Sequence, residues 1–279
     1  MQIKAEDFNL EATLDSGQVF GFKKDAEGVY EGVIAGHPAR LWQIHDQLNV
    51  QSAIPEEALI NYFDLQRNLA PVYELMRQDE KLAAAAENLR GLRLIRQNSW
   101  EALACFIISS NNNVKRIRHI WNNLSSRLSE NKNTFPSVAN IAKCHERTLR
   151  ELGLGYRAPF LSRTARLVSK NETTLDAIRQ AEYEEARERV IQFPGVGPKV
   201  ADCVLLYGFQ KHEAFPVDVW ILRVMRKLYF RNRKVSEEKV RQFGMKRWGK
   251  NAGYIQQYLF HGARTGILCG ERLRESNLD

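Results

Sequence analysis

FPGVGPKVADCVLLYGFQKHEAFPVDVW, from Phe193 to Trp220, is the segment from which the architecture of the chain can be worked out. Its first six residues, ending at Pro198, form a turn between two segments that carry apolar residues at helical spacing. Gly195 and Gly197 allow the backbone of this turn to approach a partner closely, with amide groups that point outward. Amides at the start of a helix favour an anion, and a DNA phosphate is the obvious candidate.

Two side chains with complementary chemistry follow the turn. Lys199 lies in the first turn of the next helix, and Asp218 follows Pro216 at the expected start of another. A lysine amine and a carboxylate on adjacent helix starts suit nucleophilic attack on a sugar carbon. Each residue also has a purely structural interpretation, because a lone lysine is usually a solvated charge and a lone aspartate usually caps its helix.

Cys203 stands four residues after Lys199, so the two side chains project from the same helix face. If Lys199 opens into a pocket, the Cys203 thiol is expected on its wall. The structural alternative for Cys203 is a small buried apolar side chain.

The charge of the chain favours an anionic partner. The formal net charge of the 279 residues is +8. Eleven Lys and Arg residues lie between Arg223 and Lys250, against Glu237 and Glu238 alone. A run of charge can be a solvated helix face, but beside a phosphate-binding turn it favours a DNA-facing surface.

The cysteines and the N-terminus exclude several protein classes. Four widely spaced cysteines, of which only Cys269 lies near the C-terminus, show no spacing typical of a zinc site or an iron–sulfur cluster. The N-terminal residues are not a signal peptide, and no apolar run is long enough to span a membrane. We therefore expect a soluble intracellular protein (cytoplasmic or nucleoid-associated, nuclear if eukaryotic) that needs no cofactor.

Two hydrophobic patterns divide the chain. Up to about residue 53, apolar and polar residues alternate between turn residues, which predicts an antiparallel sheet. From Pro55 onward the apolar spacing is helical. The predicted fold is α+β and mainly α: an N-terminal sheet domain with flanking helices over residues 1–85 packs on a two-lobed helical body over residues 86–279. A helix-hairpin-helix motif is expected at about residues 184–209.

These motifs resemble the helix-hairpin-helix DNA glycosylases. The hairpin, lysine and aspartate of that family match Phe193-Pro194-Gly195-Val196-Gly197, Lys199 and Pro216-Val217-Asp218. Further segments resemble the 8-oxoguanine branch of the family: SGQVFGF from Ser16, LIRQNSWEALACFIISSNNN from Leu94 with Arg116 beyond it, LGLGYRA from Leu152, and AGYIQQYLF from Ala252. The resemblance extends from about Leu14 to Phe260.

The resemblance implies roles in base recognition for four residues. The Gly17 carbonyl would accept the N7 hydrogen that 8-oxoguanine has and guanine lacks. Gln256 would bind the Watson–Crick edge of the flipped base, and Cys203 and Phe260 would sandwich its ring. Without the resemblance, Gly17 is a turn residue, and Gln256 and Phe260 are the edge of a helical core face.

The resemblance also implies a DNA-binding surface. Asn111 and Tyr156 would fill and wedge the base stack, while Arg116 and Arg157 would contact the estranged cytosine through rigid donor groups. The hairpin backbone at Gly195, Val196 and Gly197 would bind phosphate, with a monovalent cation near Val196 as an option. Some members have histidine where this chain has Trp220, so a phosphate contact by that histidine is not expected.

Three functions are compatible with these patterns. The first is a bifunctional, monomeric glycosylase that removes 8-oxoguanine from double-stranded DNA, preferably opposite cytosine, and nicks the strand through a lysine Schiff base. The second is a glycosylase for another damaged purine, whose relatives lack the lysine. The third is a non-catalytic helix-hairpin-helix DNA-binding protein.

Overall fold

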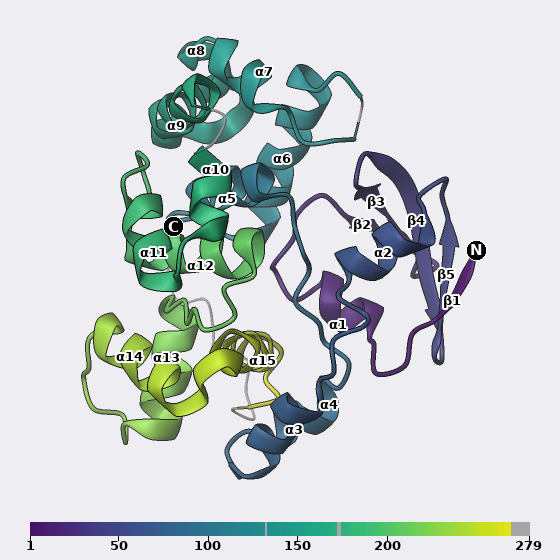
Figure 1. The fold of residues 1–279 in the computed structure, drawn as a ribbon, viewed down its shortest axis with the longest axis vertical. Helices are drawn as coiled ribbons and strands as arrows, with labels where there is room; N and C mark the ends of the chain where they lie inside the picture. The colour runs from purple at the N-terminus through teal and green to yellow at the C-terminus, as the bar shows by residue number, and fades with distance from the viewer. Residues whose placement is uncertain (132, 172–173, 269–279) are drawn as a thin grey trace.

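The computed structural model describes residues 1–131, 133–171 and 174–268, and it contains a small sheet beside a larger helical body (Figure 1). The sheet module comprises β1 (Gln2–Lys4), α1 (Leu10–Leu14), β2 (Lys23–Lys24), β3 (Tyr30–Ile34), β4 (His37–Ile44), β5 (Gln47–Gln51) and α2 (Glu56–Tyr62). The body comprises α3 (Ala70–Arg77), α4 (Ala83–Asn88), α5 (Ser99–Ile108), α6 (Val114–Leu128), α7 (Val138–Lys143), α8 (Glu146–Leu149), η1 (Arg150–Leu154), η2 (Gly155–Arg157), α9 (Ala158–Lys170), α10 (Thr174–Gln180), α11 (Tyr183–Ile191), α12 (Pro198–Phe209), α13 (Val219–Tyr229), α14 (Glu237–Trp248), η3 (Gly249–Asn251) and α15 (Ala252–Thr265).

The five strands form one antiparallel sheet in the order β1-β5-β4-β3-β2. Alternate residues of β3 and β4 are buried, as the period of two along a strand requires. The register pairs Tyr30 with Leu41, and both side chains are buried in a core of their own, which α2 completes through Leu59. Pro55 is the N-cap of α2 rather than its first helical residue, because its ψ of 140° is extended.

The helical body has two lobes joined through the middle of the molecule. Helices α7, α8 and α9 lie at one end, α13, α14 and α15 lie at the other, and α11 and α12 lie between them (Figure 1). One continuous apolar core extends through both lobes. Helix α12 packs closely on α5, where a Cβ on Gly208 would lie 2.9 Å from the Cβ of Ala102.

The hairpin between α11 and α12 has the conformation that its glycines suggest. Gly195 has a φ of +80°, and a Cβ there would lie 2.8 Å from Cβ of Phe160 on α9. The tight turn is closed by a hydrogen bond from the Val196 amide to the Phe193 carbonyl. The helix-hairpin-helix motif is therefore confirmed, and so is the α+β class with its N-terminal antiparallel sheet and two-lobed body.

The boundary between sheet domain and body stays a prediction. Helix α3 precedes residue 86 and α4 spans it, yet both helices bury residues (Val72, Met76 and Ala85) in the large core and contact α15. Among the residues that the structure describes, no helix is long and apolar enough to cross a membrane. Cys269, which bears on the absence of a cluster, lies outside the described residues.

Candidate active site

Lys199 lies at the start of α12, where the hairpin delivers it. Gly197 is the N-cap of this helix and has no side chain to bond the first-turn amides, which leaves those donors for an external acceptor. The Lys199 side chain is partly buried, and its Nζ atom lies 5.9 Å from the ring centroid of Phe106 on α5. This distance lies at the outer limit of a cation–π contact, so the ammonium is attracted toward the Phe106 ring.

Asp218 faces Lys199 from the start of α13. Its carboxylate accepts a hydrogen bond of 2.8 Å from the Ile221 amide, so Asp218 is the N-cap of α13, as the sequence predicts. Burial raises the pKa of this carboxyl, while the Lys199 ammonium and the Ile221 amide act in the opposite direction. The carboxylate therefore lies near a lysine amine in a partly dehydrated site.

Cys203 lies one turn beyond Lys199 on the same face of α12. Only 5% of its surface is exposed. Burial raises the pKa of the thiol to about 11, against the opposing effect of the nearby Lys199 ammonium. The side chain is therefore a neutral thiol at physiological pH, which suits a pocket wall and not a nucleophile.

Helix α15 and the loop after α1 supply the expected base-binding residues. The Gln256 side chain is buried, and its Nε2 donates a hydrogen bond of 3.1 Å to the Pro216 carbonyl. Its Oε1 is buried without a partner among the described residues. Phe260 lies one turn further, where its ring edge is 3.3 Å from the position of a Cβ on Gly17. An orphaned acceptor beside an aromatic ring is suited to the donor edge of a purine.

The wedge residues gather at the ends of α5 and η2. Asn111 is exposed with a left-handed φ of 49°, and Tyr156 is 50% exposed. Arg116 is exposed in the first turn of α6. Arg157 differs from the expectation, because its guanidinium is buried and donates to the carbonyls of Ser110 and Asn111. In this conformation Arg157 supports the loop after α5 that carries Asn111, which we call the wedge loop.

The hairpin carbonyls suit a monovalent cation only in part. The Phe193 carbonyl accepts from the Val196 amide, and Pro194 accepts from the Thr164 hydroxyl. The carbonyls of Gly195 and Val196 have no partner among the described residues, so they are the acceptors that fit such an ion. Among those residues there is also no His, Cys, Asp and Glu cluster that fits a metal.

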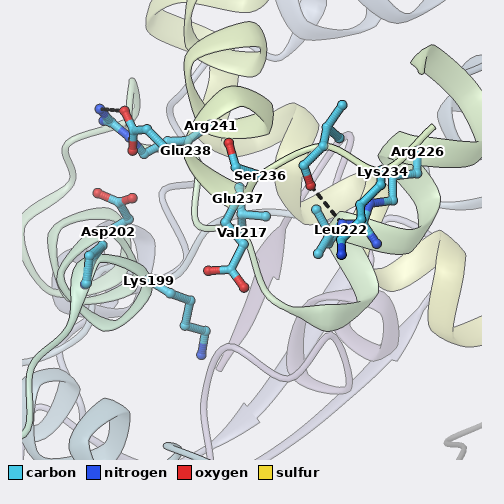
Figure 2. A pocket seen from close by; sticks show the side chains of 12 residues that line it. Lys199, Asp202, Val217, Leu222, Arg226, Lys234, Ser236, Glu237, Glu238 and Arg241 are labelled. Carbon is cyan, nitrogen blue, oxygen red and sulfur yellow. Dashed lines mark hydrogen bonds and ion pairs between the residues drawn. The ribbon is translucent and has the colours of Figure 1, made fainter. Parts of the chain in front are cut away.

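A cavity of about 610 Å³ lies between the start of α12, helix α13 and the start of α14 (Figure 2). Lys199 and Asp202 line it, but the expected base-binding residues Cys203, Gln256 and Phe260 do not. The Lys199 side chain extends away from Asp202 in Figure 2. The cavity is also lined by Leu222 and Arg226 of α13 and by residues 234–238.

Helix α12 is held to its neighbours by a buried ionic network that the sequence did not suggest. Asp202 accepts hydrogen bonds from the Tyr183 hydroxyl at 2.7 Å and from Arg187 at 2.9 Å. Arg241 of α14 donates to Tyr183 and pairs with Glu238. The sequence signal was a second charged residue, Asp202, beside Lys199 in a helix whose other residues are mostly apolar. The network ties α11, α12 and α14 together near Lys199.

The basic segment after Asp218 is only partly a surface feature. Arg241 is 9% exposed, and Arg247 pairs with Asp79 at 2.8 Å. Arg231, Arg233 and Lys234 are exposed on the loop between α13 and α14. The segment from Arg223 to Lys250 therefore exposes fewer free positive charges than its eleven Lys and Arg residues suggest.

Comparison with known proteins agrees with this geometry. Residues 1–103 match the family model of the 8-oxoguanine DNA glycosylase N-terminal domain, and residues 104–250 match that of the HhH-GPD superfamily base excision DNA repair proteins. A probable N-glycosylase/DNA lyase of Methanothermobacter thermautotrophicus is 32% identical over 99% of both chains. The N-glycosylase/DNA lyase OGG1 of Arabidopsis thaliana is 29% identical over 93% of this chain and 78% of its own.

A solved structure extends the likeness to three dimensions. The Clostridium acetobutylicum 8-oxoguanine glycosylase/lyase, in complex with double-stranded DNA containing cytosine opposite 8-oxoguanine, superposes with a TM-score of 0.87. It is 33% identical, and the match covers 94% of this chain and 93% of that one. The chain therefore belongs to the 8-oxoguanine DNA glycosylase/lyase family within the HhH-GPD superfamily of base excision DNA repair proteins.

Proposed function

We propose that this protein flips 8-oxoguanine out of duplex DNA, preferably opposite cytosine, removes it with Lys199 as nucleophile, and then nicks the strand. Membership of the family makes it an N-glycosylase/DNA lyase, and the lysine Schiff base and the cytosine preference are the proposed details. One observation carries the proposal: Lys199, Cys203 and Asp218 are close enough to influence one another electrostatically, and Gln256, whose Oε1 has no partner, bonds to the carbonyl of Pro216 two residues before Asp218.

Base recognition depends on acceptors that match the donor edge of 8-oxoguanine. The Gln256 Oε1 accepts from the Watson–Crick edge, which relieves its lack of a partner. The Gly17 carbonyl accepts the N7 hydrogen. Guanine presents a lone pair at that position, which leaves the carbonyl unpaired at a cost of about 1–3 kcal/mol. Cys203 as a neutral thiol and Phe260 enclose the ring.

The chemistry follows from the pair at the helix starts. The Lys199 ammonium first gives a proton to solvent. The neutral amine then forms a bond to C1′ of the sugar while the bond to the base breaks, and the base leaves with its electron pair and takes up the proton that the lysine nitrogen releases. The Asp218 carboxylate stabilises the positive charge that develops on the sugar. Ring opening gives a Schiff base between Lys199 and C1′, and loss of a C2′ proton then expels the 3′ phosphate by β-elimination.

The remaining residues hold the kinked duplex. Asn111 fills the vacated stack, Tyr156 wedges beside it, and Arg116 contacts the estranged cytosine. Arg157 must release the carbonyls of Ser110 and Asn111 before it contacts the cytosine, so in the free protein its first role is to support the wedge loop. We propose the contact between Arg157 and the cytosine only for the DNA-bound protein.

The hairpin supplies the grip on the DNA backbone. The uncapped amides at the start of α12 bind a phosphate of the lesion strand. The carbonyls of Gly195 and Val196 would hold a monovalent cation, which would supply positive charge beside a neighbouring phosphate. No cofactor takes part in the steps proposed above.

Borohydride trapping on a duplex with one 8-oxoguanine opposite cytosine tests the chemistry directly. We expect a covalent protein–DNA adduct with the wild type and none with Lys199→Gln, which retains duplex binding. Lys143→Gln is the matched control, because Lys143 is exposed at the end of α7, away from the site.

Each other outcome has a distinct meaning. Base release without an adduct implies a monofunctional enzyme in which Lys199 has another role. Neither adduct nor release on the lesion duplex implies a different damaged purine or a DNA-binding protein without catalysis. Normal nicking by Lys199→Gln contradicts the nucleophile assignment.

A further inference from the structure

Two buried polar side chains beside the base pocket are not used by the proposed chemistry. Tyr207 lies about two turns after Lys199 on the same face of α12 as Cys203. Gln257 follows Gln256 on α15 and has no exposed surface. The Tyr207 hydroxyl donates a hydrogen bond to the Gln257 Oε1. Such groups are costly to bury unless paired, so their pairing fixes both side chains.

The other end of Gln257 reaches the recognition loop. Its Nε2 donates a hydrogen bond of 3.2 Å to the Ser16 carbonyl, the residue before Gly17. A carbonyl only accepts, so Ser16 selects the NH₂ end of the amide and leaves Oε1 for the Tyr207 hydroxyl. A continuous hydrogen-bonded chain therefore connects the nucleophile helix α12 through α15 to the loop.

The Gly17 carbonyl lies between two carbonyls that are held in place. Ser16 is held by Gln257, and the Gln18 carbonyl accepts a hydrogen bond of 2.6 Å from Gln97 Nε2. The Gly17 carbonyl itself has no hydrogen-bond partner among the described residues. Its direction is consequently set by its neighbours, and a change in the Ser16 peptide changes where it points.

The same chain also fixes the nucleophile relative to this loop. The Tyr207 ring stacks on Phe106 with centroids 5.2 Å apart and an interplanar angle of 14°. Phe106 is the ring that the Lys199 ammonium faces. The loop that selects the base and the amine that attacks the sugar thus share one rigid support.

We propose that Tyr207 and Gln257 are positioning residues that orient the Gly17 carbonyl toward the base pocket and so set the preference for 8-oxoguanine over guanine. This inference rests on the proposed function. Both side chains are buried and their polar groups bond to each other and to Ser16, so the inference assigns them no contact with the base. Discrimination depends on one carbonyl meeting N7 at hydrogen-bond distance, and small displacements of such groups are costly.

The test compares two substrates that differ only in whether a base must be recognised. Single-turnover cleavage is measured on 8-oxoguanine opposite cytosine and on a preformed abasic site opposite cytosine, for Tyr207→Phe and Gln257→Met. We expect excision of 8-oxoguanine to fall about tenfold, the kinetic equivalent of one buried hydrogen bond. Incision of the abasic site, which needs Lys199 but no recognition of a base, stays within about twofold of wild type. Binding selectivity for the lesion duplex over an undamaged one falls in parallel.

Tyr258→Phe is the matched control for a merely structural effect. Tyr258 follows Gln257, is fully buried, and donates a hydrogen bond of 3.2 Å to the Leu92 carbonyl. We expect it to lower the melting temperature without changing the ratio of the two rates. The same behaviour in Tyr207→Phe and Gln257→Met overturns the proposal.

The two substrates also separate a failure of this inference from a failure of the proposed function on which it rests. If the wild type incises abasic sites but does not excise 8-oxoguanine, the proposed function fails and the inference fails with it. If the wild type excises 8-oxoguanine and the variants keep its rate ratio, only the inference fails. Should Gln257→Met not fold, Tyr207→Phe decides, because it loses one oxygen and retains the stacking on Phe106.

Discussion

Asp218 combines a structural and a proposed catalytic role, and two substitutions separate them. Asn retains a side-chain oxygen that accepts from the Ile221 amide, whereas Ala loses it. We expect Asp218→Ala to be about 1 kcal/mol less stable than Asp218→Asn, the usual cost of a lost N-cap. Both variants should lose most base excision. Chemical denaturation and single-turnover cleavage measure the two effects, and an active Asp218→Asn enzyme would assign the carboxylate to capping alone.

The same pair of variants gives a pH dependence with a defined sign. Burial raises the pKa of the native Asp218 carboxyl above its ordinary value of 3.8, so the ionised form destabilises the folded state. Asp218→Asn removes this cost, and it should be more stable than wild type at neutral pH. The difference should shrink as the pH falls through the native pKa and vanish below 3.8, where the carboxyl is protonated in both states.

At the scale of the element, the two hairpin glycines have different reasons to be glycine. Gly195 has a left-handed φ of +80° and no space for a Cβ beside Phe160. Gly197 has a φ of −93° and open space around a Cβ. We expect Gly195→Ala to destabilise the fold by about 1–3 kcal/mol. We expect Gly197→Ala to fold normally and to weaken DNA binding, because its methyl group occupies the proposed phosphate approach.

The control for backbone strain is Gly28→Ala. Gly28 has a φ of +85° in a turn of the sheet module, with no atom near a Cβ. It should lose stability through strain alone and bind lesion duplex as wild type does, as measured by fluorescence anisotropy. Unchanged DNA affinity in Gly197→Ala would place the phosphate elsewhere.

The sequence predicted the hairpin well because turn chemistry is local. Gly195 takes the left-handed φ and Asp218 the N-cap position that their residue types favour, and both roles are set by the local backbone. Pro55 shows where such local prediction stops, because a proline suits both the N-cap and the first turn of a helix. Only the structure shows that α2 starts after Pro55.

At the scale of the whole molecule, the net charge of +8 predicts salt-dependent DNA binding. Arg233 and Lys234 are exposed on the loop beside the cavity at the start of α12. Replacing both with Gln should reduce the slope of log K against log salt concentration by about one for each phosphate that the variant no longer neutralises. Replacing Lys143 and Arg147 with Gln removes the same charge from α7 and α8, at the opposite end of the body (Figure 1).

The two double variants separate local binding by the loop from the overall field. A reduced slope in the first and an unchanged slope in the second supports direct phosphate binding by the loop. Equal reductions in both would mean that only the net charge matters. Titrations at several salt concentrations with a lesion duplex provide the measurement.

By itself the sequence determined the fold class and the hairpin, and it predicted Lys199 and Asp218 as the reacting pair. These follow from hydrophobic period, turn residues and a motif within 28 residues, so they depend on short-range physics. Tertiary structure alone decided which polar groups meet across elements. Arg157 donates a hydrogen bond to the Ser110 carbonyl. Asp202 accepts from Tyr183 of α11, which also bonds to Arg241 of α14. Gln257 connects the Tyr207 hydroxyl to the Ser16 carbonyl. Such contacts form between residues far apart in the chain, where spacing carries no signal and only the packed core brings donor and acceptor together.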